Sequence, residues 1–209
     1  MIPNSNRFEM SSRLPLSLAA LGWLLLLSSF GARAQDSVQW TTNYYSVPGA
    51  TVPEIRESIH RNRPWKERFQ HDARTEWEVK WNFTVEPTAS GCRCRYFHTQ
   101  TTIAVYLPRW VGPTNTADRV KQTWREYAAA LSRHEAGHAE TALAAVAELH
   151  KRVPALPESP TCEGSKKQTG DLCQSILEEH RKRDLAYDEK TNHGMTQGAF
   201  LPDLGPRHR

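Results

Sequence analysis

The stretch LSRHEAGHAET, residues 131–141, contains two histidines four residues apart, with a glutamate directly after the first. In an α-helix, residues i and i+4 are neighbours on one face, so His134 and His138 could both bind one metal ion. Glu135 lies one step further round the helix, where it could act on a water molecule beside that ion. A motif this short also arises by chance, so its surroundings must decide whether it marks a zinc site.

The sequence around the motif predicts a long amphipathic helix over residues 116–153, which contain no proline and one glycine. Apolar positions recur at spacings of three and four, and both histidines fall on this stripe, on the face that would otherwise be core. The stripe consists of Tyr127, Leu131, His134, His138, Ala142, Ala145 and Leu149. In mid-helix Gly137 costs about 1 kcal/mol relative to alanine, which suggests that another backbone or a substrate comes close there.

The motif has two interpretations. Two histidines desolvated together would cost free energy unless something shared bound both. In the zinc interpretation the ion polarises a scissile carbonyl, and Glu135 deprotonates the zinc-bound water. In the alternative, His134 and His138 are core histidines satisfied by neighbours, and Glu135 is a solvated surface charge. We favour zinc because these residue types match the chemistry of a metallopeptidase.

Two stretches before the long helix alternate as β-strands do. Residues 76–86 place apolar side chains at every odd position and polar ones at every even position, which predicts a half-buried strand. The alternation resumes in TTIAVYLPRW, residues 101–110, and we expect Pro108 to end that strand. The two strands should pair antiparallel. At a sheet edge the second could align an extended peptide by strand addition, whereas the alternative is a buried strand.

Two further helices are predicted. Thr51 and Glu54 form a capping box, with Pro53 in the first turn, which opens a short helix to about Asn62. After a proline-rich connection, another helix is expected over residues 171–189. Its inward stripe begins apolar and then turns polar, and buried polar groups need partners. The stripe consists of Cys173, Ile176, Leu177, His180, Asp184, Tyr187 and Asp188.

A catalytic zinc site has three protein ligands and an open position, so a third ligand must come from outside the motif. His193 is the first choice, because a neutral imidazole is a common zinc ligand. Asp188 is the alternative, and His193 would then donate a hydrogen bond to the oxyanion that develops on the substrate carbonyl. Tyr187 is the other candidate donor, and catalysis would then depend on Glu135 and Tyr187. His180 and Asp184 are weaker candidates for the third ligand.

All four cysteines follow residue 34, in a part of the chain that we expect to be exported to an oxidising compartment, where disulfides form. A four-cysteine zinc site is the competing interpretation, but the spacings C-x-C and C-x10-C do not match paired C-x2-C knuckles. Adjacent C-x-C cysteines pair poorly with each other. We therefore expect two disulfides that join Cys92 and Cys94 to Cys162 and Cys173, with Cys162–Cys173 as the alternative.

Residues 1–34 have the layout of a secretory signal peptide: a positive start, an apolar run and a small-x-small cleavage site. An uncleaved membrane anchor is the alternative, but the apolar run is shorter than the ~20 residues that a span needs. We expect a secreted or periplasmic protein without a stable membrane span. Residues 35–209 should form one domain.

The charge balance argues against nucleic acid as a partner. The chain has 27 basic and 23 acidic residues, and removing residues 1–34 takes away three and one of them, which leaves a net charge near +2. No basic patch predicts nucleic-acid binding. We expect a peptide or protein substrate, and the sequence does not determine an oligomeric state.

Two blocks of sequence, RHEAGHAETAL (133–143) and AYDEKTNHGMTQGA (186–199), with LPRW upstream, resemble the DUF922 family of predicted secreted zinc-dependent proteases. The likeness extends from YYSVPGATVPEIR (44–56) to TQGA, over most of the mature chain. It implies an exported bacterial protein with a zincin-like fold and Zn²⁺ as cofactor. Such sequences typically show one cysteine before the long helix and one after it, whereas this chain has two and two, so the resemblance does not determine the pairing.

Taken together, the sequence predicts an α+β fold, with a small antiparallel sheet packed on a long zinc-binding helix and a second C-terminal helix, as in a minimal zincin-like domain. The expected activity is hydrolysis of peptide bonds by metal-activated water, with Glu135 as general base. One alternative is a zinc-binding envelope protein without turnover, which would have no need of a base beside the water. Another is a zinc amidase that acts on cell-wall peptides by the same water activation.

Overall fold

The computed structural model describes residues 35–65 and 71–202. The expected signal peptide, residues 1–34, lies outside the described residues. Among the helices that are described, none is long and apolar enough to cross a membrane. In chain order the elements are β1 (Ser37–Val47), α1 (Val52–Asn62), β2 (Arg74–Pro87), β3 (Cys92–Trp110), α2 (Asp118–Arg152), α3 (Cys162–Thr191) and the short 3₁₀ helix η1 (Met195–Gln197).

The sheet has three strands in the order β1-β3-β2. β2 and β3 pair antiparallel, from Arg74↔Tyr106 to Pro87↔Cys92, which confirms the predicted pair. β1 was not predicted, and it pairs parallel with β3, so the sheet is mixed rather than purely antiparallel. The first eight residues of β1 are all exposed. A strand without a buried side has no apolar alternation, which is why the pattern did not indicate it.

The expected end of β3 is wrong, and its place in the sheet decides between the two alternatives. Pro108 lacks an N–H, but the strand continues past it to Trp110, because the pairing with β1 extends beyond the proline. Val111 N donates to Val47 O at 3.0 Å. β3 is also the central strand, hydrogen-bonded on both sides. A peptide therefore cannot add to residues 101–110, and the edges of this sheet are β1 and β2.

The helices follow the sequence signals closely, except at the start of α3. In α1 the capping box is confirmed: Glu54 N donates to Thr51 Oγ1 at 3.4 Å, and Thr51 N donates to Glu54 Oε2 at 3.2 Å. α2 is confirmed almost to the residue. α3 begins at Cys162, nine residues before the predicted start at 171. Thr161 caps it by accepting a hydrogen bond from Gly164 N. Residues 162–170 have no apolar periodicity, so no pattern predicted this first part of the helix.

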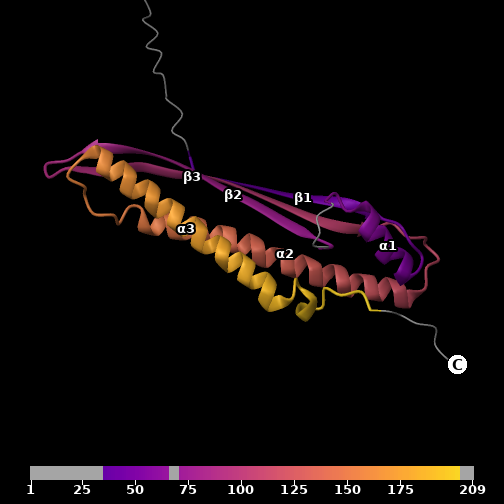
Figure 1. Cartoon of the computed structure of the whole chain (residues 1–209). Helices are drawn as coiled ribbons and strands as arrows, with labels where there is room; N and C mark the ends of the chain where they lie inside the picture. Colours follow the sequence, from indigo (N-terminus) through magenta and orange to yellow (C-terminus); the bar gives the residue numbers. More distant parts are fainter. Residues whose placement is uncertain (1–34, 66–70, 203–209) are drawn as a thin grey trace, which may run out of the picture. The chain divides into compact units, whose positions relative to one another are not determined.

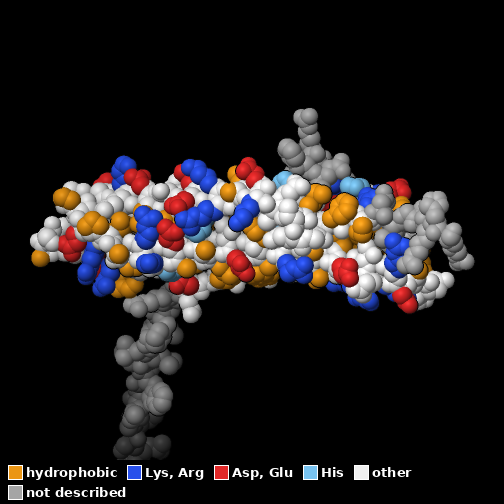
Figure 2. All heavy atoms as spheres, turned by 90° about the horizontal axis from the view of Figure 1, so that it is seen from below, with side chains coloured by type: hydrophobic (Ala, Val, Ile, Leu, Met, Phe, Trp, Pro, Cys, Tyr) orange, Lys and Arg blue, Asp and Glu red, His pale blue; other side chains and the backbone are white. Residues whose placement is uncertain are grey.

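Helices α2 and α3 lie side by side against the same face of the sheet, and both contact β2 and β3, while α1 packs against β1 (Figure 1). The α+β class is therefore confirmed. The core has two apolar clusters. One joins α1, the sheet and the first part of α2, and the other joins the end of α2 to α3 and β2. On the face drawn in Figure 2, charged side chains of both signs are interspersed with apolar ones.

One disulfide, Cys92–Cys162, joins the start of β3 to the start of α3. It confirms one of the two expected cross-links and excludes the Cys162–Cys173 pairing. Cys94 and Cys173 are free thiols, so the second expected disulfide is absent. Burial raises the pKa of both thiols, that of Cys173 to about 12, so neither is a thiolate at neutral pH.

We predict that replacing both Cys92 and Cys162 with serine destabilises the protein, because the cross-link closes a loop with a sequence separation of 70 residues. The free energy of unfolding should fall by about 2–4 kcal/mol, and Tm should fall by roughly 5–15 °C. Thermal unfolding of the oxidised protein measures both. The control Cys94→Ser should change the stability by less than about 1 kcal/mol. Equal Tm values for wild type and the double variant would contradict this prediction.

Candidate metal centre

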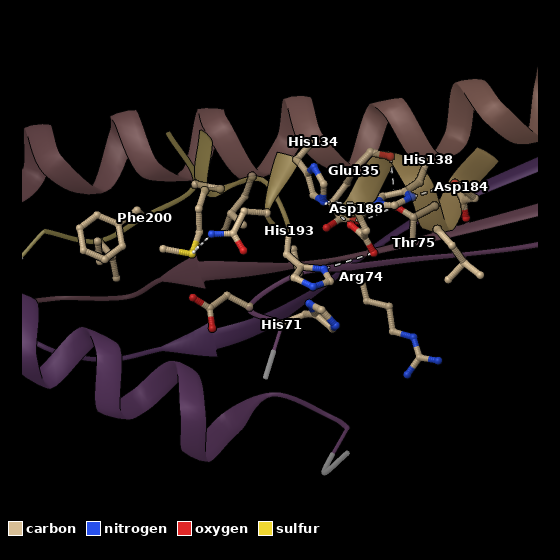
Figure 3. A pocket seen from close by; sticks show the side chains of 18 of the residues that line it. His71, Arg74, Thr75, His134, Glu135, His138, Asp184, Asp188, His193 and Phe200 are labelled. Atoms are coloured by element: carbon tan, nitrogen blue, oxygen red, sulfur yellow. Dashed lines mark hydrogen bonds and ion pairs between the residues drawn. The ribbon is translucent and has the colours of Figure 1, made fainter. Parts of the chain in front are cut away.

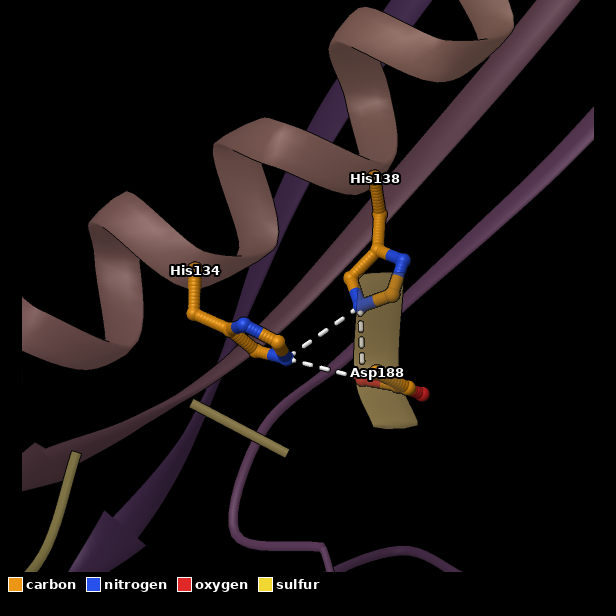
Figure 4. Close-up of side chains that lie close together, drawn as sticks. All are labelled: His134, His138 and Asp188. Carbon is orange, nitrogen blue, oxygen red and sulfur yellow. Dashed lines mark hydrogen bonds and ion pairs between the residues drawn. The ribbon is translucent and has the colours of Figure 1, made fainter. Parts of the chain in front are cut away.

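Three potential ligand atoms from two helices converge on one point (Figure 4). His134 Nε2 and His138 Nε2 lie 3.0 and 3.1 Å from Asp188 Oδ1, and the two nitrogens are 3.2 Å apart. In tetrahedral zinc sites with metal–ligand bonds of about 2.0–2.1 Å, neighbouring ligand atoms lie about 3.3 Å apart. This triangle therefore has nearly the size of one face of such a site, and these three residues could hold a metal ion.

The outer nitrogen of each imidazole is held by an acceptor. His134 Nδ1 donates to Gln197 Oε1 at 3.0 Å, and His138 Nδ1 donates to Asp184 Oδ1 at 2.8 Å. Each Nε2 atom then presents a lone pair to the centre of the triangle. Two lone pairs and a carboxylate oxygen this close repel one another unless a positive charge lies between them. The donor set therefore fits a divalent cation.

The charges around the triangle are strongly coupled. Burial alone would disfavour ionised Asp188, but hydrogen bonds with His134 and His138 hold the pKa of its carboxyl well below its usual range. Burial also acts to lower the pKa of His138, yet the hydrogen bonds with Asp184 and Asp188 outweigh it and raise this pKa to about 10. The two carboxylates thus stabilise positive charge at the centre. Metal binding would displace a proton from it.

Glu135 lies beside the triangle and is 3% exposed. Its Oε2 accepts a hydrogen bond from Thr75 Oγ1 at 2.7 Å, which connects α2 to the start of β2. Burial raises the pKa of Glu135, while Thr75 and the two histidines act in the opposite direction. A carboxylate with a raised pKa is a better proton acceptor at neutral pH. Thr75 was not predicted, because nothing in a strand pattern marks a residue 60 positions away as a partner of Glu135.

A cavity of about 530 Å³ opens onto these residues (Figure 3). Its volume lies within the usual range of ligand sites. Glu135 and the three residues of the triangle all line it, together with side chains from α1, β2 and the C-terminal segment. The other lining residues are Arg56, His60, His71, Asp72, Ala73, Arg74, Thr75, Leu131, Asp184, Leu185, Asn192, His193, Met195, Ala199, Phe200 and Leu201.

His193, the first choice for the third ligand, does not belong to the triangle. Its Nδ1 lies 3.4 Å from Asp188 Oδ2, and its side chain is 45% exposed. α3 ends in a left-handed turn, with φ of 48° at Asn192, 53° at His193 and 81° at Gly194, which brings the imidazole back against the carboxylate. The geometry therefore favours Asp188, the alternative, as the third ligand.

Two other candidates lie outside the triangle. Asp184 accepts hydrogen bonds from His138 Nδ1 and, at 3.1 Å, from Trp77 Nε1, so it orients a ligand rather than joining the set. His180 is buried and pairs with Glu148 Oε2 at 3.0 Å, on the interface of α2 and α3.

Tyr187 is not among the residues that line the cavity, which is against its expected role as an oxyanion donor. Its hydroxyl donates to the backbone O of His134 at 3.3 Å and accepts from Gln197 Nε2 at 3.1 Å. Its ring stacks on the imidazole of His134, with the ring centres 5.0 Å apart. Tyr187 therefore holds the imidazole of His134 in place without lining the cavity.

The close approach predicted at Gly137 is present, and the neighbour is an aromatic side chain. A Cβ atom at Gly137 would lie 2.5 Å from the Cζ and hydroxyl oxygen of Tyr187, closer than van der Waals contact allows. The ring that supports His134 therefore requires glycine at this position of α2.

The model of the family described as "Bacterial protein of unknown function (DUF922)" matches residues 42–194. The chain belongs to the DUF922 family. The match contains His134, His138 and Asp188, whereas Gln197, which holds His134, lies beyond its end. No curated protein and no solved structure matches this DUF922 protein.

We predict that Asp188→Ala abolishes tight zinc binding by this DUF922 protein, because the ion would lose its only anionic ligand. His193→Ala should keep zinc within about tenfold of the wild-type affinity, because His193 lies beside the outer oxygen of Asp188 and is not one of the three converging ligands. Titration with a zinc-chelator competitor measures both affinities. If His193→Ala loses zinc while Asp188→Ala retains it, the assignment of the ligands is wrong.

We also predict opposite effects of alanine at two helical glycines of this DUF922 protein. Gly137→Ala should destabilise it by about 1–3 kcal/mol, because the clash with Tyr187 outweighs the gain in helix propensity. At Gly170 a Cβ atom meets no atom of another described segment within 4 Å. Gly170→Ala should therefore stabilise the protein by about 0.5–1 kcal/mol. Urea unfolding measures the free energy of unfolding of both variants. Equal changes in this free energy would show that Tyr187 does not constrain Gly137.

Proposed function

We propose that this DUF922 protein is an exported zinc-dependent peptidase. The observation that carries the proposal is the convergence of His134, His138 and Asp188 beside the buried Glu135, in a cavity large enough for part of a peptide. The ligand set would be two imidazoles and one carboxylate, which is a known composition of catalytic zinc sites.

Each residue has a role in this proposal. Zinc at the triangle would polarise the scissile carbonyl and make a water molecule acidic. Glu135 accepts the proton of the attacking water and passes it to the leaving amine. Thr75 holds Oε2 of Glu135, so that the carboxylate keeps one orientation. His193 lines the cavity and is half exposed, which suits a donor to the oxyanion.

The burial of Glu135 favours catalysis over metal binding alone. A carboxylate that is 3% exposed costs free energy to desolvate, and Thr75 compensates only part of that cost. A protein that only stores zinc would not need this group, because the triangle holds the ion without it. A general base, in contrast, gains from a raised pKa.

Export is supported by the disulfide Cys92–Cys162, because stable disulfides form in oxidising compartments outside the cytoplasm. In the cytoplasm, by contrast, cysteines are kept reduced. This agrees with the signal peptide that we expect over residues 1–34.

The test is the variant Glu135→Gln of the mature protein. We expect it to bind zinc as tightly as wild type and to hydrolyse a quenched-fluorescent casein substrate roughly 10²–10⁴-fold more slowly, because the base is lost and the ligands are not. Glu140→Gln, on the exposed side of α2, is the matched control and should keep full activity. Equal hydrolysis rates for zinc-loaded Glu135→Gln and wild type would refute the proposal.

A further inference from the structure

The acidic groups that line the cavity lie mostly at the candidate metal centre. They are Asp72, Glu135, Asp184 and Asp188. The last three belong to the metal centre or hold one of its ligands, and Asp72 Oδ2 accepts a hydrogen bond from the hydroxyl of Tyr127 at 2.6 Å. Every acidic group of the lining therefore already has a hydrogen-bond donor within the protein.

The basic groups come from α1 and from the segment at the start of β2, which also carries Asp72. Arg56 and His60 lie four residues apart on α1 and so share one face of that helix, and His71 and Arg74 lie just before and at the start of β2. In Figure 3, His71 and Arg74 lie on the opposite side of the view from His134 and His138, which project from α2. The two guanidinium groups carry permanent charge.

These basic groups are held in place. Arg56 Nη2 donates to Leu201 O at 2.6 Å, and Arg74 Nε lies 3.1 Å from Glu76 Oε1, in an ion pair at the surface. The ring of His71 lies against that of His193, with the ring centres 4.4 Å apart. His71 and His193 thus connect this side of the cavity to the carboxylate of Asp188. Burial lowers the pKa of His71, so it adds no positive charge at neutral pH, and the permanent charge comes from the two arginines.

Apolar side chains share the same cavity. Leu185, Met195 and Phe200 line it and are 67%, 48% and 53% exposed. A small hydrated anion gains nothing from such groups, whereas a peptide can place apolar side chains on them and carboxylates near the arginines. The combination therefore fits a polypeptide better than an inorganic anion.

We propose that the cavity selects peptide segments with aspartate or glutamate close to the bond that lies at the metal centre, through Arg56, His60 and Arg74. This inference rests on the proposed peptidase function and names its substrate class. Opposite charges attract across a partly desolvated cleft, and a lysine at the same place is repelled.

The first experiment measures kcat/KM for three sets of quenched-fluorescent peptides that share a mixed apolar centre and carry glutamate, glutamine or lysine on both sides of it. For wild type we expect kcat/KM of the glutamate peptides to exceed that of the lysine peptides by about tenfold or more. This ratio should fall in 0.5 M NaCl, because salt screens exposed charges.

The double variant His60→Glu/Arg74→Glu should reverse the order of the glutamate and lysine peptides. Lys182→Glu reverses an exposed charge that does not line the cavity, and it should leave the order unchanged. Equal rates for glutamate and lysine peptides would overturn the inference and leave the peptidase function intact.

The second experiment separates binding from turnover. Fluorescence anisotropy of the same peptides, labelled, with zinc-loaded Glu135→Gln should show tighter binding of the glutamate set by a similar factor. If the glutamate peptides bind more tightly but wild type hydrolyses none of the peptides, the peptidase function is refuted and the acidic-peptide site is supported. Neither binding nor hydrolysis would refute both. Circular dichroism of His60→Glu/Arg74→Glu checks its folding, and Arg74→Gln, a milder change, should still reduce the glutamate preference about threefold.

Discussion

The close approach of three electron-rich atoms is the constraint on which the structure of this site depends. The two imidazole nitrogens of His134 and His138 and one oxygen of Asp188 lie 3.0–3.2 Å apart, and a shared proton or a metal ion between them offsets their repulsion. α2 supplies the two imidazoles by local helix geometry alone. α3 must then place one carboxylate with an accuracy of a few tenths of an ångström, and several features of the fold serve that placement.

The placement of α3 is supported at both ends. The disulfide Cys92–Cys162 joins its first residue to β3. Near its last turn, the ring of Tyr187 lies directly on Gly137 of α2, so the two helices approach closely beside the candidate metal centre. Between these points, His180 pairs with Glu148 across the helix interface. A rigid pair of helices is a suitable base for a site whose ligands must not move.

Burial of so many polar groups costs free energy, which the structure offsets by giving them partners. Asp184 accepts from both His138 and Trp77, and Gln197 connects His134 to Tyr187. These partners come from β2, from α3 and from the C-terminal segment. They orient the imidazoles within the protein itself, so an ion bound at this candidate site would have less ordering to impose.

The sequence by itself determined what depends on neighbours along the chain. The helix that carries His134 and His138, the capping box at Thr51 and the alternation of β2 were all predicted, because helix and strand periodicity is a local property. The predicted pairing of the C-x-C cysteines with the later ones was half confirmed, since strain in a short ring is local too. A close approach at Gly137 was also predicted, because glycine in mid-helix is less favourable than alanine.

Only the tertiary structure decided which distant residues meet. No periodicity distinguishes Asp188 from His193, and their positions depend on the left-handed turn that ends α3 and on how that helix packs on α2. Thr75 and the exposed strand β1 were missed because each is identified by a partner far away in the sequence, on α2 or on β3. Contacts of this kind depend on packing and chain topology, and a local pattern of residue types does not record them.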